Sequence, residues 1–374
     1  MRRNIGVLAA IVLIAAGLAV PAARAKTHLL VGLQDDAMTL HGNPALTFST
    51  MKQLRVQIAR INLNWNDVAD KRPAHPQDPS DPAYNWALYD RAIRYAAQNG
   101  IKVMLSILYA PSWANGGQPK NVPPTNYNDL RNFAYAAATR YSGHYIPNTD
   151  QFDEVYLPEV KYWLAWSEPN NPNWLQQTSG GRFVSPRSYA RICTAIWEGV
   201  HFTNFAGEKV ACGATGPRGN NIARSSRPSL SPLAFMRLAR AAGLKNLDAY
   251  AHHPYYGKPS EMPATRPGGT AVTLGNIDTL ISVVNKLWGK KRIWITEYGW
   301  QTSPPDRIFG VSFARQAAYV SQSYAIARAN PRIDMMIWFM LRDDTNLRIG
   351  WQSGLMTAGG AKKPSFSVFA RLPH

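Results

Sequence analysis

Short apolar runs alternate with longer amphipathic stretches along this chain. The runs are rich in aromatic and β-branched residues, which is the composition of a buried parallel strand. They predict strands at 28–34, 59–64, 102–108, 162–166, 209–213, 247–252, 292–296 and 334–340. Apolar residues recur at helical spacing over 82–100, 128–141, 186–205, 232–242, 276–288 and 313–329. Strand and helix therefore alternate, as they do in α/β proteins with a parallel sheet.

Eight strands with helices between them favour a single (β/α)8 barrel, the TIM-barrel architecture, over residues 26–374. The structural alternative is a doubly wound sheet, which usually has a glycine-rich phosphate-binding turn after its first strand. Residues 34–37, Gln-Asp-Asp-Ala, contain no glycine. No linker, repeat or low-complexity tract divides the chain, so we expect one domain.

The first 25 residues have the features of a secretory signal peptide. Arg2 and Arg3 precede the apolar run Ile5–Val20, and residues 23–25, Ala-Arg-Ala, have the form of a cleavage site. The alternative is an uncleaved membrane anchor, but the run is shorter than the about 20 residues that a spanning helix needs. No later segment is apolar for long enough to span a membrane, so we expect a protein that is secreted or lies on the exterior of the cell envelope.

The chain has 374 residues and a formal net charge of +18. A basic secreted protein can bind acidic polysaccharide, a cell wall or an anionic surface. The alternative is that the charge serves solubility alone, because Lys and Arg are spread along the chain without a dense block. No nucleic-acid-binding motif accompanies the charge, so we expect no nucleic-acid partner.

The two cysteines, Cys193 and Cys212, fall in a predicted helix and in the strand that follows it. The chain runs down the helix and returns along the strand over similar lengths, so the two positions lie roughly level on packed elements. A disulfide is one alternative for a chain in an oxidising compartment, and two buried free thiols are the other.

Two of the apolar runs end in a single glutamate, Glu168 and Glu297. A carboxylate at the carboxyl end of a barrel strand lies where (β/α)8 enzymes have their active sites. Two carboxylates across one cleft are the groups that cleave a glycosidic bond, because one donates a proton while the other stabilises or attacks the anomeric carbon. The sequence therefore predicts these two glutamates as a catalytic pair.

Polar and aromatic residues gather near the ends of the other predicted strands. Arg60 could hold an ionised glutamate by charge, and Tyr255 could hold it by a hydrogen bond. Aromatic rings offer flat apolar faces to sugars, although each could equally pack in the core or between loops. The aromatic candidates are Trp65, Trp113, Trp166, Trp174, Trp300 and Trp338.

These segments resemble the retaining glycoside hydrolases of clan A, and within the clan most closely families 5 and 39. The resemblance runs from Arg60 to Trp338, which is nearly the whole chain after residue 25. Residues 166–170, Trp-Ser-Glu-Pro-Asn, are similar to the acid/base segment of the clan, and residues 295–299, Ile-Thr-Glu-Tyr-Gly, to its nucleophile segment. The resemblance implies an eight-stranded barrel in which Glu168 is the general acid/base and Glu297 the nucleophile.

The resemblance also implies roles for residues around the pair. Residues 253–255, His-Pro-Tyr, are similar to a clan segment whose tyrosine supports the nucleophile, and Arg60 matches an arginine with the same task. These matches make His253 and Tyr255 candidate site residues. Trp338 matches the tryptophan that forms the floor of the subsite for the non-reducing sugar. Trp113 and Trp300 are further candidate substrate contacts.

One position departs from the pattern of the clan. Ser167 stands where an asparagine usually contacts the sugar 2-hydroxyl. A serine hydroxyl is shorter and offers one donor, so Asn170 or a water molecule would have to compensate, or the sugar differs at C2.

The implied reaction is hydrolysis of a β-glycosidic bond in an oligo- or polysaccharide by double displacement. It needs no organic cofactor. We expect no metal, because His252 and His253 are adjacent rather than spaced as a ligand pair and no third ligand is evident. The alternatives are a non-catalytic carbohydrate-binding protein on a barrel scaffold, and a transglycosylase in which an acceptor sugar displaces water.

Overall fold

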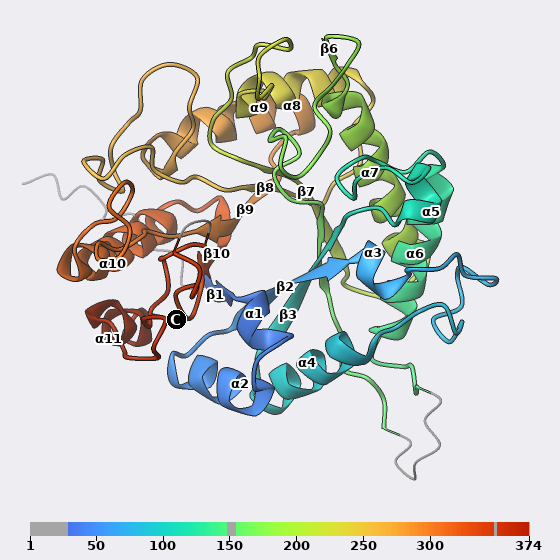
Figure 1. Cartoon of the computed structure of the whole chain (residues 1–374), viewed down its shortest axis with the longest axis horizontal. Coiled ribbons are helices and arrows are strands. Elements are labelled where there is room, and N and C mark those ends of the chain that lie inside the picture. The colour runs from blue at the N-terminus through green and yellow to red at the C-terminus, as the bar shows by residue number, and fades with distance from the viewer. Residues whose placement is uncertain (1–28, 148–154, 348–349, 374) are drawn as a thin grey trace, which may run out of the picture.

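The computed structural model describes residues 29–147, 155–347 and 350–373. Within these residues, eight parallel strands close into a barrel in the order β1-β10-β9-β8-β7-β4-β3-β2. Helices surround the strands as an outer ring (Figure 1). The predicted single (β/α)8 barrel is thereby confirmed. The predicted signal peptide, residues 1–25, lies outside the described residues.

Each barrel strand is followed by a helix of the outer ring. The strands are β1 (Leu30–Gln34), β2 (Ile58–Asn64), β3 (Lys102–Leu108), β4 (Tyr162–Ala165), β7 (Lys209–Thr215), β8 (Ala249–His252), β9 (Arg292–Tyr298) and β10 (Ile333–Phe339). The helices are α2 (Pro44–Gln53), α4 (Ala87–Gln98), α6 (Tyr127–Arg140), α7 (Ser185–His201), α8 (Pro232–Ala241), α9 (Ile277–Trp288), α10 (Phe313–Ala329) and α11 (Pro364–Ala370). The loops hold α1 (Asp36–Thr39), α3 (Trp65–Val68), α5 (Ser112–Asn115), the 3-10 helix η1 (Leu274–Asn276), and a hairpin of β5 (Thr178–Ser179) and β6 (Arg182–Phe183).

Most differences from the predicted elements are shifts of a few residues at their ends. The one that matters for function is β9, which continues through Tyr298, so that Glu297 lies inside the strand rather than in the loop after it. Two helices of the ring, α2 and α11, were not predicted. In α2 the side chain of Asn43 caps the helix and Pro44 occupies the first turn, but Leu46 is 62% exposed. Its apolar residues therefore do not follow one buried stripe.

Side chains fill the inside of the barrel and form a solid floor beneath the carboxyl ends of the strands. Trp294 of β9 and Ile337 of β10 are buried in this inner cluster, and Trp294 packs against Tyr162 with the ring centroids 5.7 Å apart. Gly32 on β1 makes room for Ile337, because a Cβ there would lie 2.2 Å from its Cδ1. The barrel is thus a packed core and not a pore.

The two cysteines form a disulfide, Cys193 of α7 with Cys212 of β7, and their Cα atoms are 6.0 Å apart. Of the two alternatives for the cysteines, a disulfide or two free thiols, the structure contains the disulfide. The link fastens the helix that follows β4 to the next strand of the barrel.

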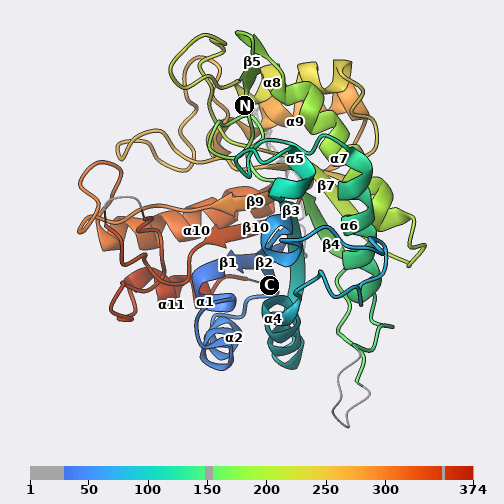
Figure 2. The same ribbon diagram turned by 45° about the vertical axis from the view of Figure 1, so that its right-hand side comes forward.

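The long loops after β7 and β8 lie side by side. The backbone N–H of Val272 donates to the carbonyl of Pro217 at 2.9 Å, and Arg218 donates to the carbonyls of Tyr255 and Tyr256 at 3.1 and 3.0 Å. Figure 2 shows these segments gathered on one side of the molecule, beyond the strand ends. No helix within the described ranges is long and apolar enough to cross a membrane.

Candidate active site

A cleft of about 550 Å³ opens at the carboxyl ends of the barrel strands. Both predicted catalytic glutamates line it: Glu168 comes from just beyond β4, and Glu297 from the last residues of β9. Asp36, Asn62 and Tyr255 line it as well. The strand ends therefore bring together residues that are far apart in the sequence.

Glu297 is held by one donor on each carboxylate oxygen. Arg60 Nη1 lies 2.9 Å from Oε2, and the Tyr255 hydroxyl donates to Oε1 at 2.8 Å. Burial and the charge of Glu297 raise the pKa of Tyr255 well above its usual value, so the phenol keeps its proton and remains a donor. Charge-assisted hydrogen bonds of this kind favour the ionised carboxylate and fix its orientation. The roles inferred for Arg60 and Tyr255 match these contacts.

Arg60 is fully buried and organises the floor of the site through all three of its nitrogens. Its Nε donates to Ser106 Oγ at 2.9 Å, and Nη1 also donates to the carbonyl of Thr296 at 2.9 Å. Nη2 donates at 3.3 Å to both Asn62 Oδ1 and Ser167 Oγ. Ser167 is buried and occupied by this contact, so the structure does not place its hydroxyl in the cleft.

Glu168 is positioned by a constrained segment of backbone. Its φ is 35°, in the left-handed region, and its N–H donates to the carbonyl of Ala214 on β7 at 2.9 Å. Strained backbone of this kind persists where the surroundings over-determine it, and it is frequent at active sites. Gly216 lies directly against the carboxyl group, since a Cβ there would be 3.0 Å from Glu168 Cδ.

The surroundings of Glu168 differ from those of Glu297. Glu297 is held by Arg60 and Tyr255, whereas burial is the main influence on the pKa of Glu168. Burial raises the pKa of the Glu168 carboxyl, while a hydrogen bond from Asn171 and the charge of Arg60 act in the opposite direction. Asn171 Nδ2 donates to Glu168 Oε2 at 2.7 Å. A carboxyl group with a raised pKa beside an ionised partner is the arrangement that separates an acid from a nucleophile.

His253 lies between the two glutamates. Its Nδ1 is 3.3 Å from Glu168 Oε1 and 3.8 Å from Glu297 Oε2. Burial lowers the pKa of His253 to about 3, so the ring is neutral. On the other side of the ring, Nε2 lies 3.0 Å from Thr296 Oγ1 and 3.4 Å from Arg60 Nη1.

Asn170 is buried beneath the loops beside the cleft and does not belong to the lining of the cleft. It is fully buried, its Nδ2 donates to the carbonyl of Leu230 at 2.8 Å, and its Oδ1 accepts from the N–H of Gly216 at 2.8 Å. These bonds tie the loop after β4 to the loop after β7. Neither Asn170 nor Ser167 therefore lies where it could replace the usual asparagine contact.

Three tryptophans that were candidate sugar contacts pack elsewhere in the structure. Trp338 is fully buried, and its indole N–H donates to the carbonyl of Ser353 at 2.9 Å. Trp300 is also buried and stacks on Tyr256 with the ring centroids 3.7 Å apart. Trp113 donates to the carbonyl of Ala69 at 2.8 Å and is not part of the cleft lining. Trp338 and Trp300 therefore have no exposed face for a sugar, while Trp113 is partly exposed outside the cleft with the Arg72 guanidinium 4.5 Å from its ring centre.

Other aromatic residues provide the apolar surface of the cleft. Trp351 is 39% exposed, and its ring packs against Tyr255 and Phe339 at centroid distances of 5.3 and 5.7 Å. Trp174 stacks against Tyr109 at 5.9 Å and also lines the cleft. Trp351 was missed because it lies in an irregular segment after the last strand, where no periodic pattern indicates which way a side chain faces.

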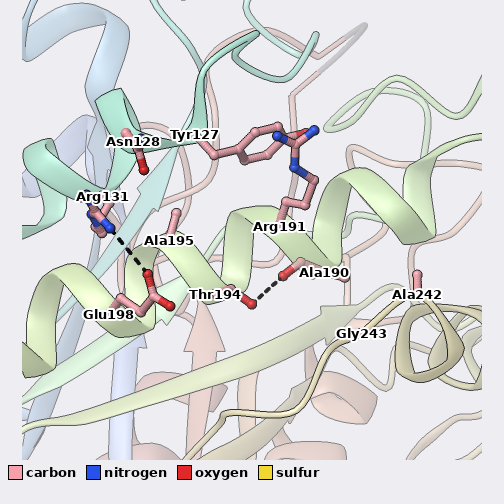
Figure 3. A pocket seen from close by; sticks show the side chains of 10 residues that line it. All are labelled: Tyr127, Asn128, Arg131, Ala190, Arg191, Thr194, Ala195, Glu198, Ala242 and Gly243. Carbon is pink, nitrogen blue, oxygen red and sulfur yellow. Dashed lines mark hydrogen bonds and ion pairs between the residues drawn. The ribbon is translucent and has the colours of Figure 1, made fainter.

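A second pocket, of about 250 Å³, lies on the outside of the barrel between α6 and α7 (Figure 3). Its charges are already partnered: Arg131 pairs with Glu198 at 3.8 Å, and the Arg191 guanidinium lies 3.9 Å from the centre of the Tyr127 ring. It has no carboxylate pair, and none of its lining residues belongs to a barrel strand. Within the ranges that the structure describes, no group of three His, Cys, Asp or Glu side chains could hold a metal ion.

Comparison with known proteins identifies no relative by sequence: no family model matches, and no curated protein matches. Solved structures do match. A family 39 glycoside hydrolase from Bacteroides cellulosilyticus WH2 superposes with a TM-score of 0.64 at 19% identity, covering 93% of this chain and 65% of that chain. A glucosidase from Croceicoccus marinus gives a TM-score of 0.65 at 14% identity, covering 92% of this chain and 65% of the other.

Shorter barrels match over their whole length. The structures of two fungal β-1,4-galactanases give a TM-score of 0.60 at 15% identity, and the alignment covers 92% of this chain and 100% of that chain. This chain thus spans about two thirds of the first two proteins and all of the galactanase barrel. At these identities the similarity establishes the fold. The solved structures with this fold include a member of family 39, one of the two families that the sequence resembles.

Proposed function

We propose that this protein is a retaining glycoside hydrolase that cleaves β-glycosidic bonds in an oligo- or polysaccharide. One observation carries the proposal: Glu168 and Glu297 face the same cleft from two strand ends, and a single nitrogen of His253 contacts both. The names of the structural neighbours, which include glucosidases and galactanases, support the same reaction class.

The two glutamates have environments suited to different tasks. Glu297, between Arg60 and Tyr255, attacks the anomeric carbon while Glu168 protonates the departing oxygen. A glycosyl ester forms on Glu297 and the leaving group departs as an alcohol. Glu168, now ionised, takes a proton from water, which attacks the anomeric carbon and releases Glu297.

The spacing of the carboxyl groups favours retention over inversion. Glu168 Oε1 and Glu297 Oε2 lie 3.3 and 3.8 Å from the same nitrogen of His253, which keeps these two oxygens close together. Retaining enzymes separate their carboxyl groups by about 5–5.5 Å, whereas inverting enzymes leave about 6.5–9.5 Å for a water molecule. One nitrogen that close to both oxygens is easier to reconcile with the shorter separation than with the upper part of the inverting range.

Secretion is part of the proposal. Its supports are the basic and apolar features of residues 1–25 and the disulfide between Cys193 and Cys212, because disulfides persist in oxidising compartments. A polysaccharide substrate outside the cell is consistent with both.

The proposal is tested by Glu168→Ala on aryl β-glycosides. We expect kcat on a substrate with a poor leaving group to fall by about 10²–10⁴-fold, since proton transfer is lost. A dinitrophenyl glycoside needs no acid, so azide should restore part of its turnover and yield a glycosyl azide. Glu198→Gln, on the outer face of α7, is the matched control and should keep full activity. Unchanged activity in Glu168→Ala would refute the assignment.

The pH profile gives a second test, through Asn171→Ala. The Asn171 amide donates to Glu168 and favours the ionised carboxylate, so its removal should raise the pKa of Glu168 further. Glu168 must be protonated for the first step, and activity falls as pH rises through its pKa. The alkaline limb of kcat/KM should therefore move to higher pH.

Asn173→Ala is the control for that shift. Asn173 belongs to the same loop and also lines the cleft, but its side chain bonds to Arg227 and not to Glu168. Its profile should keep the wild-type alkaline limb. A limb that stays in place in Asn171→Ala, or moves to lower pH, would show that Glu168 is not the titrating acid.

A further inference from the structure

A third carboxylate, Asp36, is held rigidly in the cleft beside the catalytic pair. Asp36 Oδ1 accepts from the backbone N–H of Asn62 at 3.1 Å, and Oδ2 accepts from Asn62 Nδ2 at 2.7 Å. Asn62 is in turn bound through its Oδ1 to Arg60, the residue that holds Glu297. One chain of hydrogen bonds therefore fixes the position of Asp36 relative to the nucleophile.

Gln34 lies beside Asp36, and the oxygen of its side-chain amide accepts no hydrogen bond from the described residues. Gln34 is only 2% exposed yet belongs to the lining of the cleft, and its side chain lies close enough to Asp36 to oppose the rise that burial causes in the pKa of that carboxyl. Its Oε1 has no hydrogen-bond partner among the described residues. A buried polar atom without a partner is rare in native structures and needs an explanation, of which a bound ligand is one.

Asp36 also retains capacity to accept hydrogen bonds. A carboxylate has about four lone-pair positions, and the two bonds from Asn62 leave room for a further donor. Burial raises the pKa of Asp36 to about 6, so the group is mainly ionised at neutral pH but poorly solvated. A ligand hydroxyl that donates to it replaces the missing solvation.

The charge of the cleft is negative although that of the whole chain is positive. Its described lining residues include the carboxyl groups of Asp35, Asp36, Glu168 and Glu297, and they include no lysine or arginine. Asp35 is occupied by backbone N–H groups at the start of α1 and after β10. Arg60, beneath the floor, already has its nitrogens bonded. An anionic sugar would meet like charge without a counter-ion.

We infer that Asp36 and Gln34 form a specificity site that accepts hydrogen bonds from neighbouring hydroxyl groups of an uncharged sugar residue and rejects a uronate. The inference rests on the proposed function and adds the substrate class to it. The inference runs against what the net charge alone suggests. The chain is positively charged, which by itself points to acidic polysaccharides, but the lining of the cleft is acidic.

Matched pairs of substrates that differ only at C6 test the inference. The pairs are p-nitrophenyl β-glucoside with β-glucuronide, and β-galactoside with β-galacturonide. At pH 7 we expect wild-type kcat/KM to be about a hundredfold higher for the neutral member, because the uronate is repelled. Asp36→Asn should lower kcat/KM for the neutral sugar by about tenfold to a hundredfold and reduce the preference over the uronide.

Asp70→Asn, an exposed aspartate beyond α3, is the control and should change neither value. Equal or faster cleavage of the uronides by the wild type would overturn the inference. So would an Asp36→Asn variant that keeps both the wild-type kcat/KM and the wild-type preference.

If no aryl glycoside is cleaved, the proposed function fails and the specificity site is tested by itself. The wild type is then titrated calorimetrically with the methyl β-glycosides and the methyl uronides of the same two pairs. Three results together would support the site without catalysis. The wild type binds a neutral sugar, it does not bind the matching uronide, and Asp36→Asn weakens binding of the neutral sugar by tenfold or more. No binding of either neutral sugar, or equal binding of the uronides, would overturn it.

Discussion

Replacing Glu297 by glutamine should lower kcat on an aryl β-glycoside by roughly 10⁴-fold or more, the scale seen when an enzyme loses its nucleophile. An amide cannot form the glycosyl ester, and Glu168 alone cannot stabilise the developing charge at the anomeric carbon. The measurement is initial rate against substrate concentration, with wild type and variant purified in parallel.

The fold should survive this change. Glutamine keeps an oxygen that can accept from Arg60 or from Tyr255, and the residue lies at the edge of the cleft with its side chain 12% exposed. A thermal unfolding curve close to that of the wild type would therefore accompany the loss of rate. A folded Glu297→Gln variant with wild-type turnover would contradict the assignment of the nucleophile.

Removing Arg60 should have the largest effect on stability. In Arg60→Met the carboxylate of Glu297 loses its charged partner inside the barrel, and we expect the free energy of unfolding to fall by about 3–5 kcal/mol, the usual cost of an unpaired buried charge. Asn62 and Ser167 lose a donor in the same step. The measurement is chemical denaturation, read from the midpoint and slope of the transition.

A second variant separates lost charge pairing from lost packing. If the unpaired charge causes the destabilisation, Arg60→Met combined with Glu297→Gln should be more stable than Arg60→Met alone, because no buried charge remains. Equal stability of the single and double variants would instead assign the effect to packing. Arg60→Lys, which keeps the charge but not the fork of donors, should fall between the wild type and Arg60→Met.

The barrel, and the placement of Glu168 and Glu297 in one cleft, could be predicted because their signals are local. A buried strand has a continuous apolar run, and a glutamate at the end of such a run is conspicuous. The positions of Glu168 and Glu297 could be predicted without knowing how the loops fold. Arg60, His253 and Tyr255 were found for the same reason, since each lies in a strand or within three residues of a strand end.

The substrate contacts were predicted less well, because they depend on how irregular segments fold back over the strand ends. Trp338 and Trp300 have the residue type of a sugar platform, but both are buried. Trp338 bonds to Ser353 after β10, and Trp300 packs against Tyr256 after β8 and Tyr319 of α10. Trp351 and Asp36 lie in the cleft although their neighbours in sequence give no sign of it. Burial in a loop is a tertiary property, and no periodicity encodes it.

Several strand ends share a feature that only the structure reveals. Tyr109, Trp166, Glu168, Ala214 and Met340 all adopt positive φ near the rim of the cleft. Residues other than glycine rarely adopt this conformation, and each instance costs about 1–3 kcal/mol. The rim of the barrel therefore holds strained backbone at strands that carry the site, although Arg55 before β2 and Asn204 before β7 show that positive φ is not confined to this end.

The stereochemistry of the first product tests the central claim most directly. Proton NMR during early hydrolysis of an aryl β-glycoside distinguishes the anomers before they interconvert. The account predicts that the β-anomer forms first, because Glu297 and Glu168 act in two successive displacements. If the α-anomer appears first, the reaction is a single displacement, and Glu297 is a base acting on water rather than the nucleophile.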